Sequence, residues 1–306
     1  MSLSRKIDFA VVFRVQNANP NGDPLNGNRP RTTYEGLGEL TDVCLKRKIR
    51  DRLLERGIPI FVQSDDNKVD DHPSLRARAD AVLSDIEKAV DKVKKACETW
   101  FDVRAFGQLF AFKAREAKKT KKAQAATADG EETEAAKPGE DKGVSIGIRG
   151  PVTVQSAFSV SPVSVTSTQI TKSVSGEGDG SKRASDTMGM KHRVDRGVYV
   201  FFGSMNPQLS VRTGFSDSDA EKIKAVLPCL FENDASSARP EGSMEVLKVV
   251  WWQHNCASGQ ASSAKVHRSL VVSDTDDRSE VLSFEAGKGP DDAQANWPTP
   301  EVIDGL

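Results

Sequence analysis

The sequence predicts an α+β fold in which one sheet packs against helices and carries two long insertions. Three segments show the alternation of apolar residues that is typical of strands, and they lie at residues 7–16, 152–161 and 198–202. Apolar residues at helical spacing occur at residues 36–56, 74–98 and 216–227. About thirty residues separate the second strand from the third, whereas ordinary hairpin loops have about two to five.

The first strand is predicted at residues 7–16. Apolar residues such as Phe9 and Val11 alternate with a second series that includes Asp8 and Arg14. We expect the first series to face a core and the second to stay in contact with water.

A turn-rich loop follows at residues 17–31, NANPNGDPLNGNRPR. Its two Asn-Gly pairs and three prolines predict an ordered loop rather than a helix. Arg29 and Arg31 lie at its exit, and exposed backbone amides in such a loop can hold phosphate oxygens. Asp23 could orient a ribose 2′-hydroxyl or a metal for RNA cleavage, but an aspartate in a turn more often caps its own backbone.

The next part of the chain predicts a helix, a short strand and a helical insertion. Gly57 and Pro59 end the helix at 36–56, and residues 58–62 predict a strand. Residues 63–145 are the insertion, in which the helix at 74–98 packs with Trp100, Phe101, Phe106, Leu109 and Phe110. Residues 114–142 have no periodicity and are expected to be disordered.

The second insertion, residues 164–193, separates the strands at 152–161 and 198–202. Alternation in the first of these strands places Val152, Val154, Phe158 and Val160 on one face and Ala157 and Ser159 on the other, wet face. The insertion is rich in Ser, Thr, Gly and Lys. A loop of this length in a compact domain is usually functional or disordered.

The last elements are a helix at 216–227 and a buried strand at 245–253. Ser216 and Asp219 form a capping-box pattern at the start of the helix. The tail from residue 254 is polar and acidic. Without the insertions, the order is close to the β-α-β-β-α-β order of ferredoxin-like and RRM folds, in a single domain at residues 1–306.

Composition favours a soluble, reduced, cytoplasmic protein. The chain has 306 residues, of which 37% are hydrophobic and 28% charged, with four scattered cysteines. It has no long apolar run for a membrane span and no signal-peptide pattern at its start. The net charge of −1 hides basic segments at 103–122 and 182–196 and an acidic one at 274–306, which permits nucleic-acid binding without requiring it.

Motifs for enzyme chemistry are scarce. The sequence has no P-loop pattern, and its four histidines lack zinc-ligand spacing. Gly176, Gly178 and Gly180 form a GxGxG that does not open a helix after a strand, so it indicates flexibility rather than a dinucleotide site. We therefore expect no cofactor, no metal and no catalytic residue.

Three stretches together resemble one protein family. They are RVQNANPNGDPLNGNRPR at 14–31, GIRGPVTVQSAFSVSPV at 147–163 and MGMKHRVDRGVYVFFGSMNP at 188–207. In this order and spacing they resemble the Cas-seven family, the repeated backbone subunit of type I CRISPR surveillance complexes, or Cascade, and most closely its subtype C form.

The resemblance implies an RRM-like palm with helical fingers at 63–145 and a thumb hairpin at 164–193. It also implies that copies assemble side by side along a CRISPR RNA with other Cascade subunits, and that the thumb of one copy crosses the RNA held by its neighbour. The guide then pairs with a target DNA strand in short segments. Type I members do not cut RNA. Two alternatives are a type III-like RNA endonuclease that uses Asp23 and a purely structural oligomer.

A subunit of this kind contacts phosphate and ribose and leaves the base edges free. By the resemblance, Arg29, Arg31 and Arg149 are expected to bind phosphates, as are Lys191, His192 and Arg193 at the thumb base. Asn21 in the first loop belongs to the same expected RNA-binding set, and Arg104 and Lys113 in the fingers contact either guide or target. Met188 and Met190 either wedge between bases or fill the core.

Overall fold

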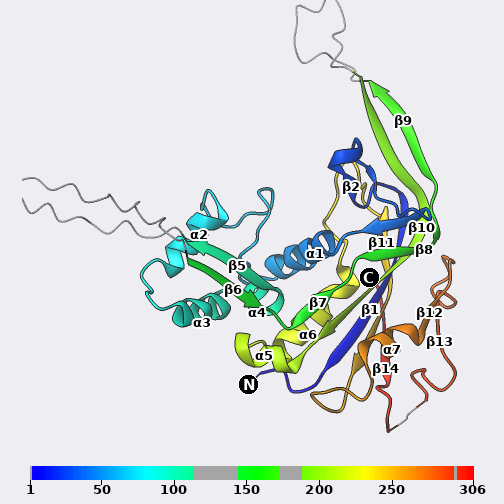
Figure 1. Cartoon of the computed structure of the whole chain (residues 1–306). Helices are drawn as coiled ribbons and strands as arrows, with labels where there is room; N and C mark the ends of the chain where they lie inside the picture. Colours follow the sequence, from blue (N-terminus) through cyan, green and yellow to red (C-terminus); the bar gives the residue numbers. More distant parts are fainter. Residues whose placement is uncertain (1, 113–143, 172–187, 293–294) are drawn as a thin grey trace, which may run out of the picture.

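The computed structural model describes residues 2–112, 144–171, 188–292 and 295–306, which form a mixed fold around one antiparallel sheet (Figure 1). The sheet order is β14-β11-β1-β10-β8-β4, and β7 and β9 also pair with β10. The predicted mixture of helices and strands is confirmed. The strands of this sheet are β1 Ile7–Ala18, β4 Leu37–Leu40, β7 Val152–Val154, β8 Ala157–Pro162, β9 Val165–Thr171, β10 Met188–Met205, β11 Met244–Gln253 and β14 Pro300–Asp304.

Both faces of β1 are buried, so the prediction that one face stays wet is wrong. Phe9 and Phe13 pack in the main core with α1 Asp42–Glu55 and α6 Asp217–Val226. On the other face, Ala10 and Val12 are fully buried as well. A central strand with two covered faces reads as a nearly continuous apolar run.

The tail covers that second face, which its polar composition did not predict. It forms α7 Ser263–Arg268, the pair β12 Leu270–Val272 and β13 Leu282–Phe284, and the edge strand β14. Val266 and Trp297 pack there with Ala10 and Trp252. The apolar residues of the tail are few, but they point to the sheet.

The helix predicted at 36–56 is shorter than expected. Residues Leu37–Leu40 form β4, and α1 begins after Thr41, whose hydroxyl accepts a hydrogen bond from the Cys44 N–H. The strand predicted at 58–62 is also wrong. The N–H groups of Phe61 and Val62 donate to the buried carboxylate of Asp102, at 2.7 and 3.1 Å, instead of to a neighbouring strand.

Residues 74–98 form two helices, α2 Leu75–Leu83 and α3 Ala89–Thr99, rather than the single predicted helix. With α4 Phe101–Phe106 and the pair β5 Gly107–Phe112 and β6 Val144–Arg149, they enclose a second cluster of buried residues that includes Phe61, Trp100 and Phe110. Phe101 packs in the main core instead. Leu109 is exposed, so its predicted packing is wrong.

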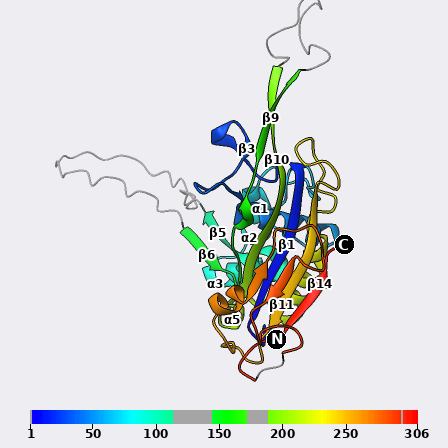
Figure 2. The same cartoon turned by 90° about the vertical axis from the view of Figure 1, so that its right-hand side faces the viewer.

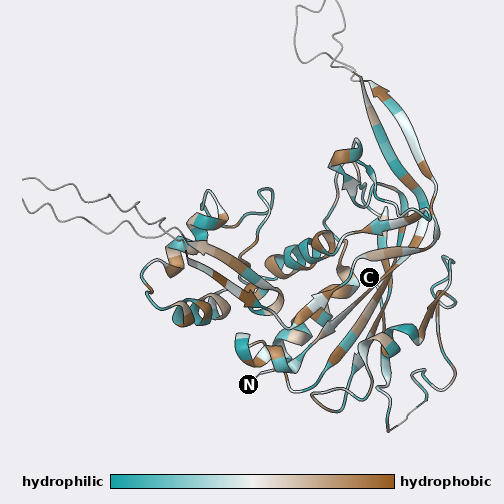
Figure 3. Cartoon of the chain, viewed as in Figure 1, coloured by the Kyte–Doolittle hydropathy of each residue, from teal (hydrophilic) through white to brown (hydrophobic). Residues whose placement is uncertain are grey.

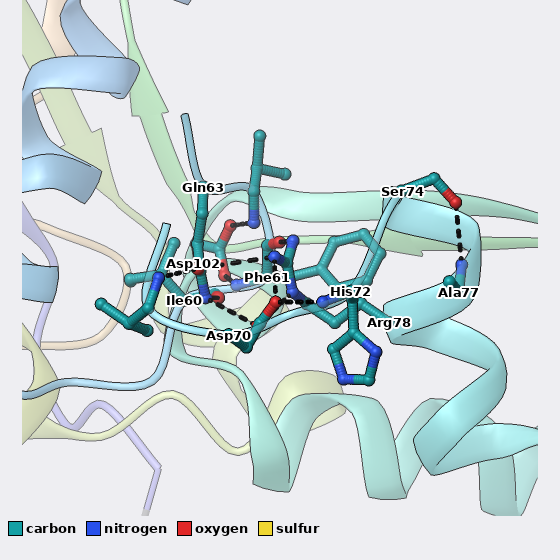
Figure 4. A network of polar contacts seen from close by, with 11 residues as sticks. Ile60, Phe61, Gln63, Asp70, His72, Ser74, Ala77, Arg78 and Asp102 are labelled. Atoms are coloured by element: carbon teal, nitrogen blue, oxygen red, sulfur yellow. Dashed lines mark hydrogen bonds and ion pairs between the residues drawn. The ribbon is translucent and has the colours of Figure 1, made fainter. Parts of the chain in front are cut away.

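A buried arginine organises the chain between α1 and α2 (Figure 4). The Arg78 guanidinium donates to both oxygens of Asp70, each at 2.7 Å, and to the Phe61 carbonyl at 2.7 Å. The Asp102 carboxylate, which accepts from the Phe61 N–H, also accepts from Arg50 Nε at 2.9 Å. These contacts replace regular secondary structure in residues 59–73.

A β-bulge separates β7 from β8 and reverses the predicted faces. Gly203 pairs with Val154 and Val200 pairs with Phe158, so β7–β8 has one extra residue in this interval. Ala157 and Ser159 are therefore buried, while Phe158 is 39% exposed. The prediction that Ala157 and Ser159 lie on the wet face is wrong.

The strand β10 continues beyond the sheet and pairs with β9 as a two-stranded ribbon (Figures 1 and 2). The described ribbon comprises residues 165–171 and 188–194. Hydrophilic residues follow much of its length (Figure 3). Residues 113–143, which include the segment predicted to be disordered, lie outside the described residues, as do residues 172–187. The palm, fingers and thumb division stays a prediction.

The remaining elements connect β10 to β11. They are α5 Pro207–Thr213, which was not predicted, then α6 and the 3-10 turn η3 Leu227–Cys229. The predicted capping box is confirmed, since Ser216 and Asp219 each bond the other's backbone N–H. The buried strand predicted at 245–253 is confirmed as β11.

Candidate nucleic-acid interface

The first loop is an ordered structure of short turns. It contains the pair β2 Gly22–Asp23 and β3 Arg29–Pro30, joined by the 3-10 turn η1 Pro24–Asn26. Gly27 and Asn28 have φ values of 59° and 58°, a conformation that glycine and asparagine tolerate. The Asn19 side chain donates to the Asn28 carbonyl at 2.7 Å and closes the loop. The predicted turn-rich loop is confirmed.

Asp23 has structural contacts within this loop. Its carboxylate accepts from the Leu25 N–H at 3.2 Å, which caps η1, and lies 3.3 Å from Arg31 Nη2. Within the described ranges, no group of three or more His, Cys, Asp and Glu side chains could hold a metal ion. The local backbone cap is thus observed, and no contact of Asp23 points to cleavage.

The two predicted phosphate-binding arginines differ in this structure. Arg31 is partly buried and paired with Asp23. Arg29 is exposed, and its side chain has no ion pair or hydrogen bond to any other described residue. Asn21 has a third role, because its side-chain oxygen accepts from the Thr41 N–H and hydroxyl at 3.0 and 3.1 Å. Asn21 therefore fixes the loop to the start of α1.

The ribbon separates its predicted site residues onto two faces. Cross-strand pairing places Lys191 opposite Thr168 and Arg193 opposite Thr166, on one face. Met188, Met190 and His192 alternate with them and occupy the other face. Lys191 is exposed without a partner among the described residues, and Arg193 Nε lies 3.4 Å from Asp195.

His192 is not an exposed cation. Its ring is buried, with 7% exposure, and Nδ1 lies 2.7 Å from the Ser167 hydroxyl across the ribbon. Its prediction as a phosphate contact beside Lys191 therefore lacks support in this geometry. Met188 and Met190 are 64% and 56% exposed, so the alternative that they fill the core is wrong.

The first loop and the ribbon meet at one end of the sheet. Ala18, the last residue of β1, pairs with Val194, where the ribbon leaves the sheet. The strand β3, with Arg29, packs against β10. Figures 1 and 2 both place the loop beside the base of the ribbon. Arg29 and Lys191, which have no partner among the described residues, thus lie on two segments that converge there.

Arg104 is engaged in a structural ion pair instead. Its Nε and Nη2 donate to the two oxygens of Asp219, both at 3.0 Å, and its guanidinium lies 4.9 Å from the centre of the Phe101 ring. Burial alone would raise the pKa of Asp219, but the hydrogen bonds and charge of Arg104 lower it. Arg104 holds α4 to α6, and we remove it from the interface.

The other predicted cations are not joined to the loop by any described contact. Arg149 ends β6, pairs through its backbone with Gly107, and is exposed. Lys113 lies outside the described residues. The role expected for Lys113 stays a prediction, and no described contact joins Arg149 to the first loop.

Tyr34, an aromatic residue near the site, was not predicted to have a role. Tyr34 lies between β3 and β4 and is fully exposed, whereas Tyr199 is fully buried. A single tyrosine between two predicted segments has no periodicity that would indicate its role. In the structure, residues 32–38 form a hairpin, so Tyr34 is not part of α1.

In the part of the chain that the structure describes, no helix is long and apolar enough to span a membrane.

Comparison with known proteins identifies relatives that match most of this chain. Residues 5–288 match the family model described as CRISPR-associated protein Cas7. A curated protein of Haloferax volcanii, "CRISPR-associated protein Cas7", is 25% identical over 256 residues, which cover 81% of this chain and 71% of that protein.

Two solved structures are also similar to this chain. A chain of a "CRISPR RNA-guided surveillance complex, pre-nicking" has a TM-score of 0.43 and 15% identity, and the match covers 80% of this chain and 75% of that chain. A chain of a "CRISPR RNA-guided surveillance complex" has a TM-score of 0.38 and 15% identity, with 80% and 68% covered.

Proposed function

Because this chain belongs to the CRISPR-associated protein Cas7 family, we propose that it is a non-catalytic backbone subunit of a CRISPR surveillance complex that binds the guide RNA. The family predicted from the sequence is confirmed, and the subtype C likeness stays a prediction. In this proposal, copies assemble along the RNA with other subunits in the cytoplasm and present the guide for pairing with target DNA.

The observation that carries the proposal is that the two segments that carry Arg29 and Lys191 meet at the base of the ribbon. Both cations are exposed and lack partners among the described residues. Cations that are already paired with carboxylates, such as Arg31, would first have to exchange partners. Contacts from unpartnered cations to phosphates carry no sequence information, which suits a protein that must accept any guide.

The elements of the sheet support the RRM-like part of the proposal. Along the chain, β1, α1, β8, β10, α6 and β11 follow the β-α-β-β-α-β order. The ribbon then corresponds to the proposed thumb, and the region around α2, α3, β5 and β6 to the proposed fingers. On the ribbon, the exposed methionines occupy the face opposite Lys191 and Arg193, so a thumb would offer a wedge on one side and charge on the other.

The contacts of Asp23 favour the non-catalytic reading over the endonuclease alternative. A carboxylate that caps η1 and pairs with Arg31 is already engaged. The endonuclease alternative predicts metal-dependent RNA cleavage that is lost in Asp23→Ala. The purely structural alternative predicts assembly without RNA.

The proposal is tested by RNA binding of the full chain at several salt concentrations. Arg29→Ala with Lys191→Ala should weaken binding and reduce the slope of log affinity against log salt by about 1.4, because each phosphate contact to a single strand contributes about 0.7. The matched control is Arg212→Ala with Arg268→Ala, which removes the same charge from α5 and α7.

Equal affinity and slope in the wild type and the Arg29/Lys191 double variant would refute the interface. Purification with partner subunits adds a second measurement. A protected RNA of defined length should accompany the complex, and RNase treatment should disassemble it. Filaments free of RNA would instead favour the structural oligomer.

A further inference from the structure

The tip of a second hairpin, residues 32–38, carries a fully exposed aromatic ring. The relative exposure of Tyr34 is 106%. Single exposed apolar side chains are common on proteins and usually need no explanation. What distinguishes Tyr34 is the structure beneath it, which holds the residue in a fixed position.

Hydrogen bonds between its two short arms close the hairpin. The Thr33 N–H donates to the Leu37 carbonyl at 2.8 Å, and the Gly36 N–H donates to the Thr33 carbonyl at 3.0 Å. The Thr33 hydroxyl accepts from the Leu37 N–H at 3.2 Å. Gly36 has a φ of 83°, which closes the turn and which glycine adopts without strain.

Further hydrogen bonds attach this hairpin to the base of the ribbon. The Gly36 carbonyl accepts from the Val163 N–H at 3.0 Å, at the point where β8 leads into β9. The Gly38 N–H donates to the buried Ser159 hydroxyl at 2.8 Å. Tyr34 is therefore presented beside the junction at which the first loop and the ribbon meet.

The surroundings of the ring select the kind of ligand. Its sequence neighbours Thr32, Thr33 and Glu35 are polar, whereas a protein-docking surface needs a contiguous apolar patch. Glu35 would repel a phosphate placed directly on the tip. A flat aromatic ring on a fixed support suits the face of an unpaired base, because stacking accepts any base.

We infer that Tyr34 is a stacking platform for one unpaired base of a single-stranded RNA whose phosphates are bound by the neighbouring loop and ribbon. This inference rests on the proposed RNA-binding function. It adds an apolar, salt-independent contact to an interface otherwise made of charges. It also accounts for the hydrogen-bonded backbone beneath the ring, which places Tyr34 beside the loop and the ribbon.

The test compares two labelled probes of equal length, an oligoadenylate and an RNA in which every nucleotide is abasic. With the full chain, Tyr34→Ala should weaken oligoadenylate binding roughly tenfold without changing its salt slope. Binding of the abasic RNA should stay unchanged, because that probe has phosphates and riboses but nothing to stack.

Two control variants isolate the ring. Tyr34→Phe keeps the aromatic face and should bind both probes as the wild type does. Leu25→Ala removes an apolar side chain that is 98% exposed on the neighbouring turn, and it should also leave both affinities unchanged. Tyr34 has no described packing partner to lose, so the fold should be preserved in all three variants.

The inference is overturned if Tyr34→Ala weakens both probes equally, or if it leaves both unchanged while the wild-type chain binds RNA. Loss of self-association with normal RNA affinity would also overturn it and would assign the ring to a protein contact. A wild-type chain that binds neither probe would refute the proposed function itself, which is a different result.

Discussion

The two parts of β10 obey different rules although they form one continuous strand. From Gly197 to Met205 the strand lies between β1 and the β7–β8 segment, and most of its side chains enter cores on both faces. From Met188 to Arg193 it pairs only with β9, and five of these six residues are exposed. Both parts pair antiparallel, but the first has paired strands on both edges and the second on one edge.

The comparison indicates that the surroundings of a side chain decide whether a substitution acts on stability or on binding in this chain. In the sheet, a side chain is fixed by neighbours on all sides, so a substitution acts on folding. In the ribbon, a side chain meets mainly water, so a substitution leaves folding almost unchanged and acts on what the ribbon contacts. The sizes of the stability effects should therefore fall steeply from the sheet to the ribbon.

The largest loss of unfolding free energy is expected at Asp8, which is fully buried near the start of β1. Its carboxylate lies 2.8 Å from His254 Nε2, 3.2 Å from Lys6 Nζ and 3.4 Å from His267 Nε2. Burial favours the neutral acid, but the hydrogen bond with His254 and the nearby His267 and Lys6 outweigh this and lower the pKa of Asp8 below its usual range. Asp8→Ala should cost about 3–5 kcal/mol, because its partners lose their counter-charge.

The matched variant is Asp195→Ala at the base of the ribbon. The Asp195 carboxylate pairs with Arg193, and both side chains are at least 40% exposed. An exposed pair of this kind contributes at most about 1 kcal/mol. Urea unfolding followed by tryptophan fluorescence measures both variants. Similar losses of unfolding free energy for the two would contradict the comparison.

A second prediction compares two glycines within β10 itself. A Cβ at Gly203 would run into the ring of Phe9, whereas a Cβ at Gly189 would lie 3.5 Å from Ile170, an ordinary contact. Gly203→Val should therefore destabilise the protein by about 1–3 kcal/mol through overpacking, and Gly189→Val should change stability by less than about 0.5 kcal/mol.

Thermal unfolding of the two valine variants is the measurement. The β-branched residue is the same in both, so intrinsic strand propensity cancels and only the surroundings differ. A Gly189→Val variant as unstable as Gly203→Val would mean that the ribbon is packed against something in the isolated chain.

Much of the sheet was predictable because local patterns decide it. The alternation in β1, the apolar run of β11 and the capping box of α6 each lie within one short segment. The second face of β1 was not predictable, because Val266 and Trp297, which cover it, lie more than 250 residues along the chain. The reversal at Ala157 depends on a bulge that alternation alone does not reveal.

The candidate site was predictable in its location but not in its details. The loop sequence indicated ordered turns with two arginines, but only the geometry shows that Asp23 pairs with Arg31, while Arg29 has no partner among the described residues. Lys191 and His192 were both predicted to bind phosphate, because a loop at 164–193 sets no direction for its side chains. In a strand, adjacent residues face opposite sides, so the two cannot act together.

A smaller loss than at Asp8 or Gly203 is expected at an ion pair that is neither fully buried nor fully exposed. The Asp70 carboxylate is 28% exposed and bonds to the buried Arg78 (Figure 4). The hydrogen bonds from Arg78 are the main reason that the pKa of Asp70 is lowered from 3.8 to about 2. Asp70→Asn should cost about 1 kcal/mol at neutral pH, once solvent screening is allowed for.

The pH dependence of that cost gives the sharper measurement. A carboxylate whose pKa is lower in the folded state stabilises the protein above its unfolded pKa, and this contribution is lost as the pH falls through the folded pKa. The difference in unfolding free energy between wild type and Asp70→Asn should therefore stay constant above about pH 4 and shrink between pH 4 and about 2. Asp71→Asn, at an exposed neighbouring carboxylate, is the control and should show no such difference. A gap between wild type and Asp70→Asn that persists at pH 2 would mean that the asparagine disturbs packing around Arg78 rather than removing a charge.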